Sequence, residues 1–85
     1  MNYLPETTAH VRITKRCWRQ GKIEGEVNTG AYEWQFQWCF TQGQLWIQPS
    51  LGRALIQEHL SRFLEHNDYQ LELGSNYQFL LREEI

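Results

Sequence analysis

The sequence predicts an α+β domain of two layers, in which a mostly antiparallel, curved sheet packs one face on a single helix. Several stretches alternate apolar and polar residues in pairs that suit hairpins, and one segment carries apolar residues at helical spacing. The predicted element order is β-β-β-β-α-β-β. The 85 residues form one domain, 1–85, without a linker or internal repeat. We expect residues 1–7 to be an irregular lead-in, since Pro5 opposes regular structure.

The first hairpin is predicted from residues 10–18 and 22–27, which alternate between apolar and polar. A three-residue loop, 19–21, ends on Gly21 and allows the left-handed conformation there. This loop length sets the pairs Ile13–Val27, Cys17–Ile23, Arg16–Glu24 and Trp18–Lys22 and leaves Lys15 facing Gly25. The polar face of its first strand then carries Arg12, Thr14, Arg16 and Trp18.

The third strand has the strongest pattern in the chain, because every second residue from 32 to 40 is aromatic. These residues are Tyr32, Trp34, Phe36, Trp38 and Phe40. Gly25 of the second strand then faces an aromatic ring, an arrangement that stabilises sheets. A two-residue turn at 42–43 leads into a fourth strand over 45–48 and pairs Phe40 with Leu45 and Trp38 with Ile47.

A helix is predicted over residues 51–66, with Ser50 as the N-cap and Asn67-Asp68 ending it. Its apolar half holds Leu55, Ile56, His59, Leu60, Phe63 and Leu64. Glu58 and Arg62 form a supporting pair on the other half. A last hairpin is predicted from residues 69–73 and 77–81, in which Leu73 pairs with Tyr77 and Tyr69 with Leu81.

Motifs of common catalytic or cofactor sites are missing from the sequence, so we expect neither an enzyme nor a bound cofactor or metal. Glu24 and Glu26 share a strand face, where two carboxylates could act in acid–base catalysis. Basic and polar residues are expected opposite them, however, and suit ordinary cross-strand pairs. His59 and His66 are separated by about 10 Å of helix, too far for one metal ion. Cys39 has no His or Lys within three positions to lower its pKa.

A protein-interaction module is the function we expect, with its docking surface on the sheet face opposite the helix. The predicted register places Trp46 next to Cys39 on that face, and Trp18 outward beside Arg16 and Lys22. Tryptophan and arginine commonly anchor interfaces. The predicted partner-binding residues are Trp18, Trp46, Gln35 and Gln37. In the alternative arrangement, Tyr3 and Leu4 fold back over Trp46 and complete the core.

RNA binding by the first hairpin is the alternative function. Residues 1–30 carry five basic and three acidic groups, whereas residues 31–85 carry three and seven, within a net charge of -2. Arginine could contact phosphate while an indole stacks on a base. The candidate residues are Arg12, Arg16, Arg19, Lys22 and Trp18. Glu24 and Glu26 could instead neutralise this hairpin, and no RNP-type or GxxG motif is present.

The two cysteines, Cys17 and Cys39, favour reduced thiols in a cytoplasmic protein. No apolar run approaches the ~20 residues that cross a bilayer, and the first residues lack the features of a signal peptide. We therefore expect a soluble protein. We also expect it to be a monomer or weak dimer and to bind a protein partner.

Three runs of sequence carry a resemblance to a known family: residues 32–38, 49–56 and 68–72, which read YEWQFQW, PSLGRALI and DYQLE. They resemble a family of short cyanobacterial proteins of unknown function, and the resemblance covers nearly the whole chain. It implies a cyanobacterial setting, in the cytoplasm or next to the thylakoid, and supplies no catalytic residues.

Overall fold

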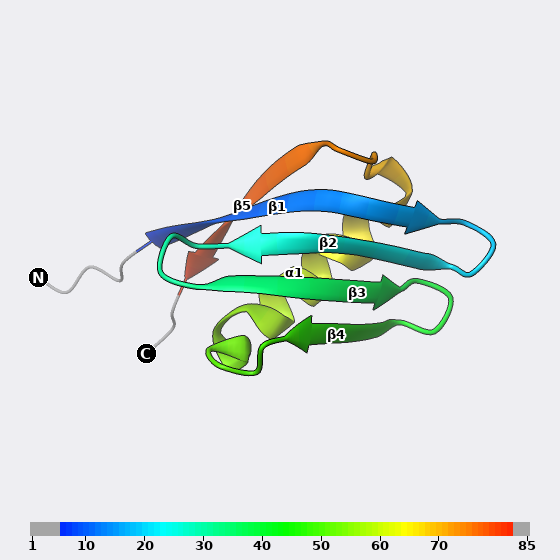
Figure 1. The fold of residues 1–85 in the computed structure, drawn as a ribbon. Coiled ribbons are helices and arrows are strands. Elements are labelled where there is room, and N and C mark those ends of the chain that lie inside the picture. Colours follow the sequence, from blue (N-terminus) through cyan, green and yellow to red (C-terminus); the bar gives the residue numbers. More distant parts are fainter. Residues whose placement is uncertain (1–5, 83–85) are drawn as a thin grey trace, which may run out of the picture.

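Residues 6–82 are described by the structure, a computed structural model, and form a single antiparallel sheet covered on one face by a helix (Figure 1). The strands are β1 (Glu6–Cys17), β2 (Lys22–Asn28), β3 (Glu33–Cys39), β4 (Gln44–Gln48) and β5 (Asn76–Arg82), in the spatial order β4-β3-β2-β1-β5. Helix α1 (Arg53–Asn67) and the 3-10 turn η1 (Asp68–Gln70) lie between β4 and β5 in sequence. This arrangement confirms the predicted α+β class, and the sheet is open.

The predicted last hairpin is wrong, because residues 69–73 form no strand and β5 pairs with β1 instead. Asp68–Gln70 extend the helix by a 3-10 turn, and Leu71 is fully buried in the core. Beyond it, the backbone N–H of Gly74 donates to the carbonyl of Ile13 at 2.8 Å. The chain therefore joins the free edge of β1 directly, and the sheet has five strands rather than six.

The predicted lead-in over 1–7 is also too long. Residues 1–5 lie outside the described part, but Glu6 and Thr7 belong to β1, where they pair with Arg82 and Leu81. Pairing with β5 extends β1 toward the N-terminus. The local alternation of apolar and polar residues did not reveal this pairing.

The register of the first hairpin differs from the prediction because β1 contains a bulge between Ile13 and Lys15. Ile13 lies opposite Gly25, and after the bulge Arg16 lies opposite Ile23. The extra residue moves Arg16 to the helix side of the sheet. It leaves Lys15 opposite Glu24, with Nζ 3.7 Å from the carboxylate.

Both hairpin loops at this end of the sheet have four residues, at 18–21 and 40–43. They share the pattern aromatic-x-Gln-Gly after a cysteine, a short repeat that the sequence reading missed. Each final glycine has a φ of 66°, so the left-handed Gly21 is confirmed. The predicted three-residue loop 19–21 is wrong, because Trp18 also belongs to the loop. The predicted two-residue turn at 42–43 is wrong, and β4 is shifted by two residues: Trp38 lies opposite Leu45.

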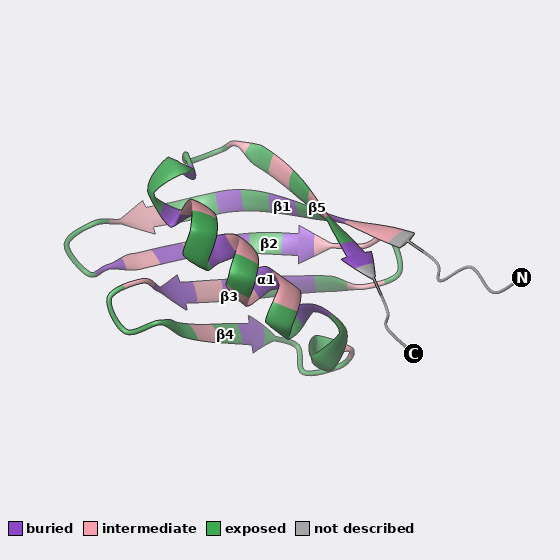
Figure 2. Ribbon diagram, turned by 180° about the vertical axis from the view of Figure 1, so that it is seen from behind, coloured by how far each residue is buried: buried purple, intermediate pink, exposed green. Residues whose placement is uncertain are grey.

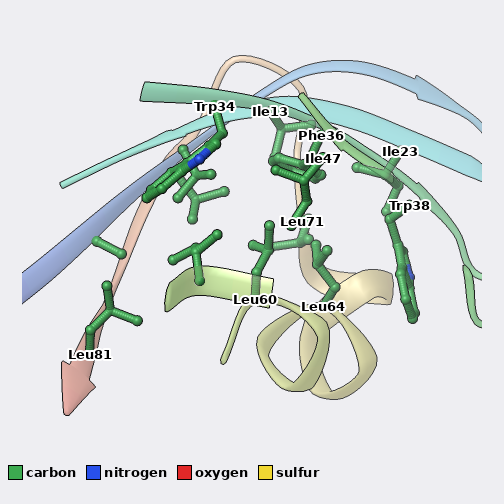
Figure 3. Close-up of a cluster of buried hydrophobic side chains, with 14 residues drawn as sticks. Ile13, Ile23, Trp34, Phe36, Trp38, Ile47, Leu60, Leu64, Leu71 and Leu81 are labelled. Carbon is green, nitrogen blue, oxygen red and sulfur yellow. The ribbon is translucent and has the colours of Figure 1, made fainter. Parts of the chain in front are cut away.

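The two-residue shift of β4 against β3 keeps every side chain on its predicted face of the sheet, because the shift is an even number of residues. Trp34, Phe36 and Trp38 are buried against the helix, as the alternation predicted (Figure 3). Phe36 also lies opposite Gly25, which confirms the predicted pairing of glycine with an aromatic ring. A Cβ on Gly25 would lie 2.3 Å from the Arg12 carbonyl oxygen, so no larger residue fits there without backbone movement.

Helix α1 starts at Arg53 rather than at residue 51, and Gly52, not the predicted Ser50, takes the N-cap position with a φ of 72°. The indole N–H of Trp34 donates to the Leu51 carbonyl at 2.8 Å and holds the preceding loop against the sheet. Ile56, Leu60 and Leu64 face the sheet, with the helix lying diagonally across it (Figure 2). The predicted Glu58–Arg62 pair is confirmed at 2.7 Å, whereas Leu55 is exposed.

Candidate functional site

The face of the sheet opposite α1 is not covered by any element within residues 6–82 (Figure 1). The pairing places Glu24, Gln37 and Trp46 in one row across β2, β3 and β4 on this outer face. The neighbouring row contains Glu26, Gln35 and Gln48. Because side chains alternate along each strand, these rows point away from the buried core.

Trp46 is the centre of an uncharged group on β3 and β4, called here the amide patch: Gln35, Gln37, Gln44, Trp46 and Gln48. Gln37 lies directly opposite Trp46, while Gln44 and Gln48 lie two residues to either side of it on the same strand. The indole is 48 % exposed. It offers a flat apolar surface and one N–H donor, and each glutamine offers both a donor and an acceptor.

The outer face of β1 and β2, in contrast, is charged. Arg12 lies opposite Glu26, and Lys15 contacts Glu24. Exposed pairs of this kind contribute little to stability. They do balance the local charge, so this half of the face is no continuous basic surface.

Trp18 does not join Trp46 on the outer face, which corrects the predicted surface. It begins the loop 18–21 and contacts residues on the helix side: its ring centroid lies 5.2 Å from that of Phe40 and 6.0 Å from that of Tyr69. The guanidinium carbon of Arg16 lies 4.1 Å from the Trp18 ring centroid. The bulge in β1 is the cause, because it shifts the alternation by one residue and so places Arg16 and Trp18, rather than Cys17, on the helix side.

The predicted RNA-binding residues are also separated by this bulge. Arg12 and Lys22 belong to the outer face, and Arg16 lies on the helix side, where it donates to the Tyr69 carbonyl at 3.4 Å. Arg19 is exposed in the loop 18–21. The structure therefore does not gather these side chains on one surface.

A shallow cleft of about 490 Å³ adjoins the amide patch, at the end of the sheet away from the loops 18–21 and 40–43. Its polar lining residues are Glu26, Asn28, Glu33, Gln35 and Gln48. Sequence reasoning missed this cleft. The sequence does place Glu26, Gln35 and Gln48 at positions that face outward on their strands. Only the correct register, however, brings these three residues together in one row.

Cys39 is buried on the outer side of β3, with its Sγ 3.4 Å from Oγ1 of Thr41. The hydrogen bond with Thr41 lowers the pKa of the Cys39 thiol below 9.0; burial opposes this, and Lys22 adds a smaller lowering. Lys22 lies opposite Cys39 on the neighbouring strand, so a search along the sequence could not find it. Within residues 6–82, no three His, Cys, Asp or Glu side chains are grouped to hold a metal ion.

Three further findings bear on what the chain is. In the part of the chain that the structure describes, no helix has both the length and the apolar character needed to cross a membrane. Neither a curated protein nor a solved structure matches the sequence. The comparison with protein families matches residues 5–84 to the family described as "Protein of unknown function (DUF3146)". Since this match spans nearly the whole sequence, the chain belongs to that family.

Proposed function

We propose that this protein is a non-enzymatic interaction module that docks a protein partner on the outer face of its sheet, with Trp46 as the anchor. The observation that carries the proposal is the position of Trp46: nearly half exposed, at the centre of the amide patch, on a face that no described element covers. An apolar ring held on a rigid strand loses little conformational freedom on binding.

The composition of the patch supports a protein partner. Interface centres are depleted in charged residues and enriched in aromatic ones, and the amide patch has one tryptophan and no charge. Docking there desolvates no ion, which is the costly part of burying a polar surface. The charged pairs on β1 and β2 lie beside the patch, where they suit a solvated rim.

RNA binding has weaker support, because the basic side chains are divided between two faces and Arg12, on the outer face, lies opposite the acidic Glu26. An RNA-binding surface needs a continuous positive potential along the phosphates. The cyanobacterial setting stays an implication of the family resemblance, and the cytoplasmic location stays a prediction from the sequence.

Affinity capture from native lysate tests the proposal with three proteins: wild type, Trp46→Ala and Leu73→Ala. Leu73 is a matched control, since it is a large, exposed apolar residue outside the patch. We expect Trp46→Ala to lose at least about tenfold of the captured partner, as an interface anchor does, while Leu73→Ala retains it. Retention by Trp46→Ala would contradict the proposal.

A titration with mixed-sequence single-stranded RNA distinguishes the alternative. Saturable binding that weakens steeply between low and moderate salt would favour RNA as the partner. We expect no saturable binding at moderate salt.

A further inference from the structure

Strand β4 forms one edge of the sheet, and only β3 pairs with it within residues 6–82. In an antiparallel sheet, alternate residues of an edge strand direct their N–H and C=O groups away from the neighbouring strand. Such an edge can accept a further strand. Proteins commonly protect edges with charged side chains, yet no residue of Gln44–Gln48 is charged.

The sequence of β4 is nearly symmetric about its middle residue: Gln-Leu-Trp-Ile-Gln. In an antiparallel pairing of β4 with β4 of a second copy, centred on Trp46, each residue meets one of its own kind. Gln44 lies opposite Gln48, Leu45 opposite Ile47, and Trp46 opposite Trp46 of the other copy. Aromatic pairs and aliphatic pairs are both favourable across strands.

The opposite edge of the sheet lacks this symmetry. Strand β5 reads Asn-Tyr-Gln-Phe-Leu-Leu-Arg, so self-pairing about Phe79 would place Gln78 opposite Leu80. An amide and an aliphatic group would then meet on the outer face. Of the two edge strands, β4 is the one that is self-complementary about its middle residue.

We propose that a second copy of this chain pairs antiparallel with β4 about a two-fold axis at Trp46. The two five-stranded sheets become one continuous sheet, and their outer faces become one surface with two adjacent indoles at its centre. The uncharged strands meet without like-charge repulsion. The shared strip is only five residues long, so its area falls in the range of weak, reversible associations. This pairing does not depend on the proposed function.

Sedimentation velocity from about 1 µM to about 1 mM tests the pairing over the range of weak dimers. We expect the mass of the wild type to rise with concentration toward twice that of one chain. Trp46→Lys places two ammonium groups face to face and should raise the dimer Kd at least about tenfold, equivalent to 1.4 kcal/mol. Gln37→Lys makes the same charge change on the same face, but on β3 inside the sheet, and should leave the Kd within about twofold.

A charge exchange identifies the contact itself. Trp46→Lys and Trp46→Glu should each be monomeric, and an equimolar mixture should recover the dimer, because residue 46 meets its own counterpart only in this register. A wild type that stays monomeric throughout the concentration range overturns the proposal. So does a dimer that Trp46→Lys leaves unchanged, or a mixture without recovery.

Hydrogen exchange on the wild type gives a measurement that depends on no variant. Backbone amides within Gln44–Gln48 should gain protection as the concentration rises, because the second copy accepts their hydrogen bonds. Amides within β5 should show no change. Protection that increases in β5 and not in β4 contradicts the proposal.

Discussion

Trp18 and Trp46 are almost equally exposed, 49 % and 48 %, yet they lie on opposite sides of the sheet. Trp18 stacks on Tyr69, meets Phe40 edge to face and lies beneath the guanidinium of Arg16. Trp46 is surrounded by glutamines on the outer face. Equal exposure thus accompanies different physical roles, because the contacts of Trp18 join a hairpin loop to the end of the helix.

Substitution of the two tryptophans by alanine should therefore have unequal effects on stability. Trp18→Ala should lower the free energy of unfolding by about 1–3 kcal/mol, since two ring contacts and a cation–π contact are lost. Trp46→Ala should change it by no more than about 0.5 kcal/mol, as is usual for surface positions. Urea unfolding followed by circular dichroism measures both values, and equal losses would contradict this assignment.

Gly25→Ala should be among the most damaging single substitutions in the sheet. The new Cβ would lie 2.3 Å from the Arg12 carbonyl oxygen and 2.7 Å from the Phe36 ring. We expect a loss of about 3 kcal/mol or more, or failure to fold. The additional substitution Phe36→Leu should not restore stability, because the carbonyl oxygen belongs to the backbone of β1.

Gly43→Ala is the matched control for Gly25→Ala. Gly43 has a φ of 66°, but no atom beyond its chain neighbours lies within 4 Å of the position of a Cβ. Only conformational strain remains, and we expect a loss of about 1 kcal/mol. If Gly43→Ala proves as damaging as Gly25→Ala in the same unfolding experiment, the close approach at Gly25 is not the cause.

Asp68→Ala should destabilise the protein although Asp68 lies at the end of the helix. The indole N–H of the buried Trp38 donates to Oδ2 of Asp68 at 3.5 Å. Removing the acceptor leaves a buried donor without its partner, which costs about 1–3 kcal/mol. Glu65→Ala, an exposed acidic position on the same helix, should cost less than about 0.5 kcal/mol. A thermal or chemical unfolding series compares the two.

The thiol of Cys39 should make stability depend on pH on the alkaline side. Its pKa is lowered from 9.0 in the folded protein, chiefly by the Thr41 hydroxyl. The thiolate is favoured by folding, so its contribution is fully present above pH 9.0 and is lost as the pH falls through the lowered pKa. The free energy of unfolding of wild type, relative to Cys39→Ser, should therefore rise with pH in that window.

Thr41→Val provides the test of the cause. Without the hydroxyl, the pKa of Cys39 should move back toward 9.0. Thiolate absorbance near the ultraviolet edge, recorded against pH for wild type and both variants, measures the shift. An unchanged titration in Thr41→Val would show that the hydroxyl does not stabilise the thiolate.

Alternation in the sequence was enough to predict which face of the sheet is buried, because the aromatic row of β3 leaves no other choice. That prediction survived a register error in the β3–β4 hairpin, since a shift of two residues preserves the faces. The outward position of Trp46 was predictable for the same reason. It needed only parity, and no knowledge of the partner strands.

The position of Trp18 was not predictable by parity, because a bulge adds one residue to β1 and reverses every face after it. The only local sign was Lys15, a charged residue on what otherwise reads as the apolar face. The strand prediction for residues 69–73 is wrong for another reason. Their alternation is typical of a strand, but β5 pairs with the edge of β1, and of the alternating apolar residues only Leu71 enters the core. Which segment pairs with the edge of β1 depends on the whole sheet, so the local sequence of residues 69–73 does not reveal it.

From the pairing of β1 with β5 we expect parts of the sheet to form at different stages. Strands β1 to β4 are joined by short loops and pair with their neighbours in sequence, so their contacts are local and quick to form. Thr7 meets Leu81 only after the chain has closed a loop of more than seventy residues. During synthesis, the first strand therefore emerges long before its last neighbour. Until residues 76–82 arrive, one edge of β1 is unpaired, and we expect the newly made chain to be most prone to aggregation just before the sheet is complete.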